Sequence, residues 1–228
     1  MIRLLPAPRL SRPALFYQKY TTNASSPELP EKLVYPDSPT ANHNDLPSFL
    51  QYASQIDMDP ASTVYVGTHY EYTVQTALSR LGMSLKRIGG RSDYGIDLLG
   101  TWNLPSAAQP LKVLIQCKAV AEKVKPSQAR ELEGAFVGAP TGWRGSGVLA
   151  FLVSKKPATK GVREALGRSR WPMGYVLCED DGRVLQMLWN RKAEQESLEG
   201  VGVGLKYGGG EKSEREVVLT WKGEAIKD

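Results

Sequence analysis

The sequence is poor in cysteine and histidine, with two of each among 228 residues. Cys117 and Cys178 lie in apolar runs and form no CxxC pair, which argues against a disulfide framework or a zinc site and fits a reducing compartment. Long apolar runs are also missing. None approaches the roughly 20 residues that cross a bilayer, so no membrane span is expected. The content of 41% hydrophobic and 23% charged residues is that of a globular protein.

Acidic residues are absent from the first 27 positions, where four basic residues alternate with apolar ones: Arg3, Arg9, Arg12 and Lys19. This composition predicts a mitochondrial transit peptide over residues 1–27, with a disordered basic tail as the alternative. The chain carries a net charge of +5. Without these four residues its 29 basic side chains become 25 against 24 acidic ones, so the total charge says little about a nucleic-acid partner.

The basic residues concentrate in the middle of the chain. Residues 111–172 hold 12 basic and 4 acidic side chains, whereas residues 28–110 hold 5 and 9 and residues 173–228 hold 8 and 11. Such a cluster on one surface would attract a polyanion, although solvated helix faces also collect lysine and arginine. Four of these residues follow an apolar run and begin a helix, and we expect them to hold a nucleic-acid backbone: Lys155, Lys156, Lys160 and Arg163.

Hydrophobic periodicity divides the chain into segments. Residues 28–62 are rich in Pro, Ser, Asn and Asp and indicate a largely irregular linker, in which only "FLQYASQI" could form one or two helical turns. From Thr63 the pattern predicts a helix, three strands, a helix, a strand, a helix and a hairpin turned at Asp181 and Gly182. The segments are, in order, "GTHYEYTVQTALSRLG", "SLKRIGG", "YGIDLLGTW", "LKVLIQCKAV", "KPSQARELEGAFVG", "GVLAFLVS", "TKGVREALGRSRW" and "GYVLCEDDGRVLQMLW".

This order predicts one α/β domain over residues 63–192, with a mixed central sheet flanked by helices. Residues 193–228 form a Gly-rich and charged extension. Its stretch "GVGVGLKYGGG" lacks the strand and helix that surround a phosphate-binding glycine motif, so a flexible loop is expected there.

Asp97 stands between Ile96 and Leu98 in a run that is typical of a strand entering the core. An ionised carboxylate there costs on the order of several kcal/mol unless a cation or a set of donors meets it. Alternation along "LKVLIQCKAV" puts Gln116 and Lys118 on one face. If the two strands pair, Asp97 can lie beside both.

A carboxylate, an amide oxygen and an ammonium suit a hard divalent cation. Asp97 and Gln116 would be the ligands, and Lys118 would stabilise charge on the attacking water and the scissile phosphate. Glu71, near the start of the first helix, is a further carboxylate for this site. The alternative is an ion pair of Asp97 with Lys118 at a sheet edge, with Gln116 as its hydrogen-bond partner.

The text "YE" on a helix, then "SDYGIDLLG", then "VLIQCKA" resembles the Mrr-like branch of the restriction-endonuclease superfamily, the PD-(D/E)xK fold. The family signature is a Gly-Asp-x-Gly-x-Asp strand followed by a Gln-x-Lys strand, in an α-β-β-β-α-β core. The resemblance covers residues 67–189 and places the family's metal-binding and catalytic positions on Asp97, Gln116, Lys118 and, on the helix, Glu71. The upstream acid falls on Asp93, and Tyr94 stands where a glycine is usual.

With its transit-like leader, this core is similar to the fungal mitochondrial required-for-respiratory-growth proteins, a nuclease-like group. The resemblance implies a Mg²⁺-dependent or Mn²⁺-dependent endonuclease of the mitochondrial matrix that hydrolyses DNA, in mitochondrial DNA maintenance. Two alternatives stay open: an inactive nuclease fold that acts as a nucleic-acid-binding or structural factor, and a protein-interaction subunit of the respiratory machinery. The sequence also leaves open whether RNA replaces DNA, and whether a homodimer forms to cut both strands.

Overall fold

The computed structural model describes residues 33–90, 95–207 and 215–226. The predicted transit peptide, Asp93 and Tyr94 lie outside these residues. Five helices are described: α1 (Leu46–Gln55), α2 (Thr63–Ser79), α3 (Pro126–Gly138), α4 (Lys160–Arg168) and α5 (Arg191–Glu196). Within the described ranges, no helix combines the length and the apolar character that crossing a membrane requires.

The strands fall into two sheets. The first contains β1 (Met83–Arg87), β2 (Leu98–Trp102), β3 (Leu111–Lys118), β4 (Val148–Ser154), β5 (Met173–Cys178) and β6 (Val184–Trp189), and the second contains β7 (Val201–Tyr207), β8 (Arg215–Trp221) and β9 (Glu224–Ala225). The helices and strands predicted from Thr63 to the hairpin are confirmed, with ends shifted by a few residues.

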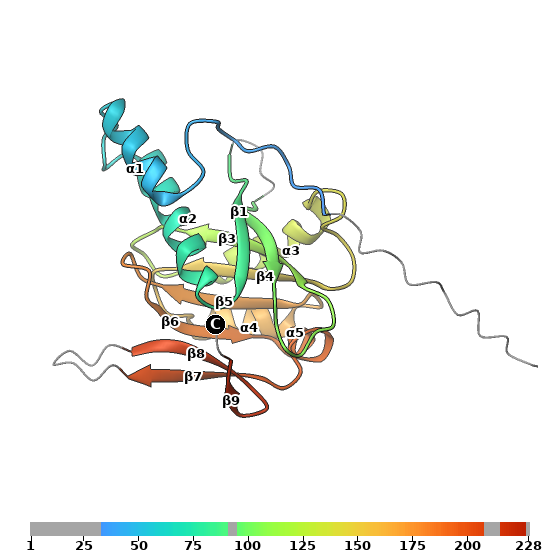
Figure 1. Ribbon diagram of the computed structural model, residues 1–228. Coiled ribbons are helices and arrows are strands. Elements are labelled where there is room, and N and C mark those ends of the chain that lie inside the picture. The colour runs from blue at the N-terminus through green and yellow to red at the C-terminus, as the bar shows by residue number, and fades with distance from the viewer. Residues whose placement is uncertain (1–32, 91–94, 208–214, 227–228) are drawn as a thin grey trace, which may run out of the picture. The chain divides into compact units, whose positions relative to one another are not determined.

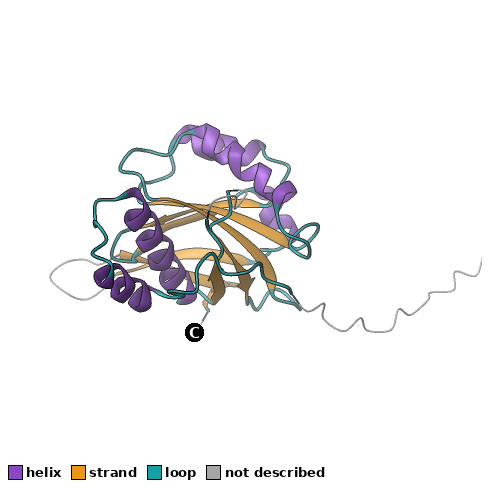
Figure 2. Ribbon diagram, turned by 90° about the horizontal axis from the view of Figure 1, so that it is seen from above, coloured by secondary structure: helices purple, strands orange, loops and turns teal. Residues whose placement is uncertain are grey.

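The first sheet is mixed, and its strands lie in sequence order. The strands β1, β2 and β3 are antiparallel neighbours, β3, β4 and β5 run parallel, and β6 returns antiparallel to β5. Figure 1 shows α2 crossing one face of this sheet, and Figure 2 shows helices on both sides of the strands. The predicted mixed α/β fold with a central sheet flanked by helices is therefore confirmed.

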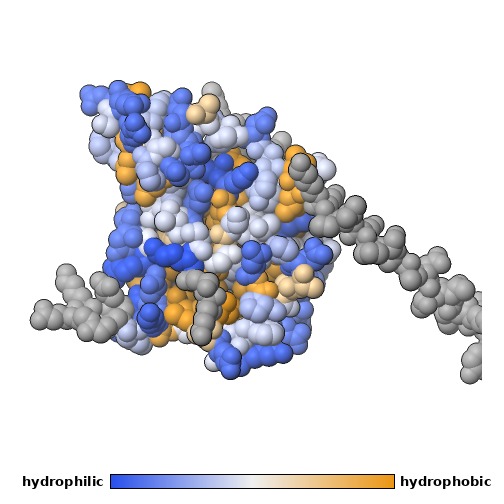
Figure 3. All heavy atoms as spheres, in the orientation of Figure 1, coloured by the Kyte–Doolittle hydropathy of each residue, from blue (hydrophilic) through white to orange (hydrophobic). Residues whose placement is uncertain are grey.

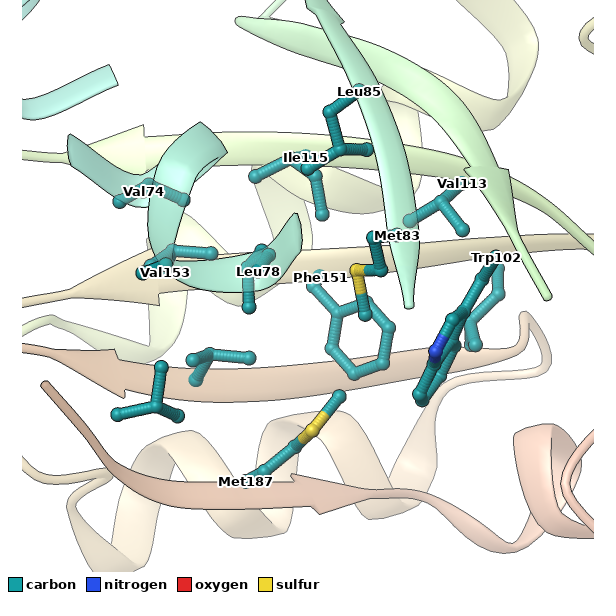
Figure 4. Close-up of a cluster of buried hydrophobic side chains, with 14 of the residues drawn as sticks. Val74, Leu78, Met83, Leu85, Trp102, Val113, Ile115, Phe151, Val153 and Met187 are labelled. Atoms are coloured by element: carbon teal, nitrogen blue, oxygen red, sulfur yellow. The ribbon is translucent and has the colours of Figure 1, made fainter. Parts of the chain in front are cut away.

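Alternation along the strands builds a core on each face of the sheet. The α2-side core joins α2 to one set of strand residues. Figure 4 labels ten members of this core, two from α2 and eight from the strands: Val74, Leu78, Met83, Leu85, Trp102, Val113, Ile115, Phe151, Val153 and Met187. The α3/α4-side core joins α3 and α4 to the alternate strand residues, and its members include Leu99, Leu114, Leu132, Leu152 and Val162. All seven residues of β4 are buried, because both of its faces are covered.

The helices begin where the sequence supplies caps. The Ser62 side chain accepts a hydrogen bond from the backbone N–H of Tyr65 at the start of α2, at 3.2 Å, and Thr159 accepts one from Val162 at the start of α4, at 3.3 Å. A proline opens α3 at Pro126, where the missing N–H costs nothing. These caps fix where the helices start on the two sides of the sheet.

The segment predicted as a linker contains α1. Phe49 and Ala53 of this helix are buried against Tyr72 of α2. Residues 33–45 have no helix or strand but are attached to the domain at both ends. The Trp143 indole N–H donates to the carbonyl of Val34 at 2.8 Å, and His43 Nδ1 lies 2.8 Å from the Tyr72 hydroxyl.

The expectation of a flexible loop at "GVGVGLKYGGG" is wrong for its first residues, because Val201–Tyr207 form β7 and pair with β8 along their whole length. Val217 and Leu219 of β8 are buried, so they supply an apolar partner for the strand. Gly202 permits the close approach, since a Cβ there would lie 2.6 Å from Thr220 Oγ1. Hydrophobic residues gather where this second sheet meets β6 (Figure 3).

Gly100 on β2 is a strict packing requirement of the first sheet. A Cβ at this position would lie 1.9 Å from the backbone oxygen of Ser84 on β1. Gly100→Ala is therefore expected to lower the free energy of unfolding by about 3 kcal/mol, measured by urea titration. Gly134 on α3 has no atom within 4 Å of its Cβ position, so the control Gly134→Ala should raise stability by about 1 kcal/mol. Equal stability of the two variants would contradict the β1–β2 packing.

Candidate functional site

The pairing of β2 with β3 brings Asp97 to Gln116. Leu98 and Ile115 are register partners, and one residue earlier the Asp97 N–H donates to the Ile115 carbonyl at 2.8 Å. Asp97 thus immediately precedes β2 instead of lying inside it. Leu99 and Leu114, which are also partners, both belong to the α3/α4-side core. By alternation Gln116 and Lys118 of β3 are on this same side.

Backbone groups from two strands hold Asp97 in place. Its Oδ2 accepts a hydrogen bond from the backbone N–H of Cys117 at 2.6 Å. Its carbonyl oxygen accepts from the N–H groups of Ile88 and Gly89, at 2.8 and 2.9 Å. A charge-assisted bond to a backbone amide is among the stronger hydrogen bonds in proteins. The carboxylate is therefore oriented by the backbone, before any cation is considered.

Gln116 is the most unusual polar residue of the site. It is 6% exposed, and its Oε1 is buried with no hydrogen-bond partner among the described residues. Its Nε2 lies against Gly95, where a Cβ would approach it to 3.0 Å. Leaving a buried amide oxygen unpaired costs about 1–3 kcal/mol. Such a group in a native protein calls for a ligand or a role.

Lys118 ends β3 and is only loosely paired. Its Nζ lies 3.8 Å from Glu131 Oε2 on α3, and its side chain is 23% exposed, against 54% for Glu131. An ion pair of this length to a half-exposed carboxylate contributes little to stability. The predicted alternative, an ion pair between Asp97 and Lys118, is not among the ion pairs of the described residues, where Lys118 pairs with Glu131.

Glu71 of α2 and Asp97 both approach Gly89. A Cβ on Gly89 would be 3.2 Å from Glu71 Oε2 and 3.2 Å from Asp97 Oδ1, so the two carboxylate oxygens are at most twice that distance apart. A side chain at position 89 would push into both. Glycine is the residue that lets the two carboxylates converge.

Arg87 is the site residue that the sequence analysis missed. It ends β1, its Nε donates to Glu71 Oε2, and the two side chains are 12% and 14% exposed. The signal was present, because alternation places Arg87 on the same face as the buried Met83 and Leu85. A buried arginine on an apolar face predicts a buried acidic partner.

The two carboxylates act on the neighbouring thiol. Burial and then the charges of Asp97 and Glu71 raise the pKa of Cys117 well above its ordinary value. This thiol therefore stays protonated and is a poor nucleophile at neutral pH.

Within the described ranges there is no group of three or more His, Cys, Asp or Glu residues that could hold a metal. The oxygen atoms available to a metal here are those of the two acids and the amide oxygen of Gln116, and oxygen ligands are the kind that Mg²⁺ and Mn²⁺ accept. The residues present fit such an ion.

The four basic residues predicted to hold nucleic acid do not share one surface. Lys155 Nζ lies 2.5 Å from Asp180 Oδ1 and 5.1 Å from the ring centre of Tyr70, which belongs to the α2-side core. Lys160 and Arg163 are exposed at the start of α4, which packs in the α3/α4-side core. Lys156 lies between them, partly buried. Lys160 and Arg163 are thus on the side of Gln116 and Lys118, and Lys155 is on the other.

Comparison with known proteins gives one family. A sequence model of the family described as "Required for respiratory growth protein 7" matches residues 62–109 and 104–204. An uncharacterized mitochondrial protein of Schizosaccharomyces pombe is 33% identical over 158 residues, which are 68% of this chain and 62% of that protein. The mitochondrial Required for respiratory growth protein 7 of Saccharomyces cerevisiae is 28% identical over 175 residues, 58% of this chain and 72% of that protein. No solved structure matches the chain.

The match thus spans less than two thirds of the Schizosaccharomyces pombe relative. The names of these relatives state a mitochondrial location, which supports the location predicted from the basic leader. The name of the Saccharomyces cerevisiae relative states a requirement for respiratory growth, and neither name states an enzymatic activity.

Proposed function

Because the chain belongs to the Required for respiratory growth protein 7 family, we propose that it is a metal-dependent nuclease of the mitochondrial matrix that hydrolyses phosphodiester bonds, with DNA as its substrate. The observation that carries the proposal is Gln116, whose buried Oε1 has no partner among the described residues. Gln116 directly follows Ile115, which pairs with Leu98, the residue after Asp97. A buried amide oxygen and a carboxylate oriented by the backbone can supply two of the oxygen ligands of a divalent cation.

The fold supports the proposal. The order α2, β1, β2, β3, α3, β4 is the α-β-β-β-α-β order expected of an Mrr-like, restriction-endonuclease-like core. Asp97 immediately precedes β2, and Gln116 and Lys118 lie near the end of β3, which supports the roles that the resemblance implies for them. Fold alone does not establish chemistry, so the proposal depends on the site.

Asp97 and Gln116 would hold Mg²⁺ or Mn²⁺, with Glu71 as the carboxylate beside them. When bound, such an ion polarises a phosphoryl oxygen and lowers the pKa of water. The Cys117 N–H keeps the Asp97 carboxylate aimed. The Lys118 ammonium stabilises the negative charge that develops on the phosphate. The α2-side and α3/α4-side cores fix both strands that carry these groups, which is the rigidity that a hydrolytic site needs.

A specific observation favours the runner-up, an inactive nuclease fold that binds nucleic acid or acts as a structural factor. Glu71 is engaged by Arg87, and Lys118 lies within 3.8 Å of Glu131. Both groups therefore have structural partners in addition to their proposed chemical roles. The two functions differ in one property, because only the first requires turnover.

Lys160 and Arg163 are expected to contact the nucleic-acid backbone. Lys160 is 87% exposed with Glu164 3.9 Å away, and both basic residues lie in the first turn of α4, where backbone N–H groups also favour anions. The double change Lys160→Gln and Arg163→Gln should weaken binding to all DNA sequences alike. It should also flatten the slope of log affinity against log salt by about 0.9 for each lost contact. Fluorescence anisotropy at several salt concentrations measures both.

The control replaces two lysines of the second sheet, Lys206→Gln and Lys222→Gln. These residues lie at the end of β7 and after β8, so their loss should leave the slope unchanged. Equal slopes for both double variants would place the nucleic-acid surface away from α4.

The activity itself is tested with the purified full chain on supercoiled plasmid, branched DNA and single-stranded RNA. Nicking that needs Mg²⁺ or Mn²⁺ and stops with EDTA is the expected result. Salt-sensitive binding without any cleavage would favour the inactive nucleic-acid-binding factor. Neither binding nor cleavage would favour a protein-interaction subunit.

A further inference from the structure

Arg87 is placed by β1 and α2 together. It ends β1, and its guanidinium lies over one stretch of α2, contacting Glu71 through Nε and Thr68 Oγ1 through Nη2, the latter at 3.4 Å. Its guanidinium carbon is also 5.7 Å from the ring centre of Tyr72. Thr68 is a neighbour of both Glu71 and Tyr72 on the helix surface, so together these residues fix the position of the arginine side chain.

The segment before α1 packs against this part of α2, at Tyr72. His43 Nδ1 lies 2.8 Å from the Tyr72 hydroxyl, and the same hydroxyl donates to the His43 carbonyl at 3.2 Å. Tyr72 is buried. The ring that lies under the guanidinium therefore has little freedom to move, and Arg87 is restrained along with it.

The pair of Arg87 and Glu71 is buried, with side chains that are 12% and 14% exposed. Separating two such charges leaves each without solvent, so a buried pair stays together unless another charge replaces one partner. The replaced partner here would be the arginine. The Glu71 oxygen that accepts from Arg87 is Oε2, which is also the oxygen that faces the Gly89 position together with Asp97 Oδ1.

We propose that Arg87 is a positioning residue that keeps Glu71 out of the metal site and thereby limits the affinity for a divalent cation. In this account Asp97 and Gln116 hold the ion, and Glu71 belongs to Arg87. The inference rests on the proposed function, since it concerns the same cation site. The guanidinium acts in two ways. It binds the Glu71 oxygen that faces the Gly89 position together with Asp97 Oδ1, and its own positive charge opposes a second cation nearby.

The test is a calorimetric titration of Mn²⁺ into the purified full chain without nucleic acid. Arg87→Met removes the charge and releases Glu71, so it should bind Mn²⁺ about tenfold more tightly than the wild type. Arg87→Lys keeps the charge near Glu71 and should stay within about threefold of the wild type. The affinity is read directly, so no turnover is required.

Two further variants separate a specific effect from a general one. Arg80→Met removes an arginine at the far end of α2, 3.4 Å from Glu216, and should leave the Mn²⁺ affinity unchanged. The double variant Glu71→Gln with Arg87→Met leaves no buried charge unpaired, and it should bind Mn²⁺ within about threefold of the wild type. This double variant also serves if Arg87→Met alone does not fold.

The outcomes distinguish the two proposals. If the wild type binds Mn²⁺ and Asp97→Asn does not, the cation site stands. Unchanged or weaker binding by Arg87→Met then overturns the role of Arg87 alone. A loss of tenfold or more in the double variant would also overturn it, because Glu71 would then be a ligand in the wild type. If the wild type binds no Mn²⁺, or if Asp97→Asn binds it equally well, the cation site falls and the role of Arg87 falls with it.

Discussion

Asp97→Asn is expected to abolish magnesium-dependent strand cleavage, by about a thousandfold or more, while nucleic-acid binding stays close to that of the wild type. The asparagine keeps the shape of the side chain, and its oxygen can still accept from the Cys117 N–H, which lies 2.6 Å from Asp97 Oδ2. What disappears is the charge that holds the cation. Plasmid nicking measures the first effect, and anisotropy in EDTA measures the second.

The stability of Asp97→Asn should not fall along with its activity. Without metal, the asparagine keeps the shape of the side chain and can still accept from the Cys117 N–H, so the melting temperature in EDTA should stay close to that of the wild type. A variant that melts well below the wild type would show that lost folding explains lost activity. Full magnesium-dependent cleavage by a folded Asp97→Asn would remove Asp97 from the site altogether.

Lys118→Ala is expected to slow cleavage by about a hundredfold, which is the usual loss when one preorganised electrostatic group is removed. Folding should be little affected, because the contact of Lys118 with Glu131 is long, at 3.8 Å, and half-exposed. Lys118→Arg should recover little of the rate, since a planar guanidinium does not replace a compact ammonium next to a cation. Single-turnover kinetics at saturating Mg²⁺ measure the rate directly.

A matched control lies on the same strand. Lys112 of β3 is on the same face, six positions earlier, and its Nζ donates to the Gly142 carbonyl at 2.6 Å. Lys112→Ala should leave the single-turnover rate of the folded protein unchanged. Near-normal turnover by Lys118→Arg would reduce the lysine to a partner for a carboxylate, and equal losses in Lys112→Ala would indicate a general effect on β3.

The elements that were predictable are those whose signal is local. The apolar run of β4 is predicted as a strand from its own sequence, and all seven of its residues are buried. The strand β7 was missed because its formation depends on a distant partner. Val201 pairs with Trp221, and glycine-rich sequence has low strand propensity until such a partner is known.

The candidate site shows the same division. The backbone proximity of Asp97 and Gln116 could be predicted, because an antiparallel connection pairs Leu98 with Ile115 and so brings the residues next to them together. The pair of Glu71 and Arg87 could not, since it joins a helix to a strand whose relative placement the sequence does not specify. The absence of a partner for Gln116 Oε1 among the described residues could not be predicted either, because hydrogen-bond satisfaction is a property of the packed state.

The location of a bound cation is the most direct test of the proposed site at Asp97 and Gln116. Fe²⁺ bound in place of Mg²⁺, with ascorbate and hydrogen peroxide, cuts a polypeptide backbone close to the metal. We expect cuts in the wild-type chain just before β2, around Asp97, and near the end of β3, around Gln116. Excess Mg²⁺ should abolish these cuts, and so should Asp97→Asn. Cuts confined to another acidic segment, such as the turn from Glu179 to Asp181, or a pattern unchanged in Asp97→Asn, would contradict it.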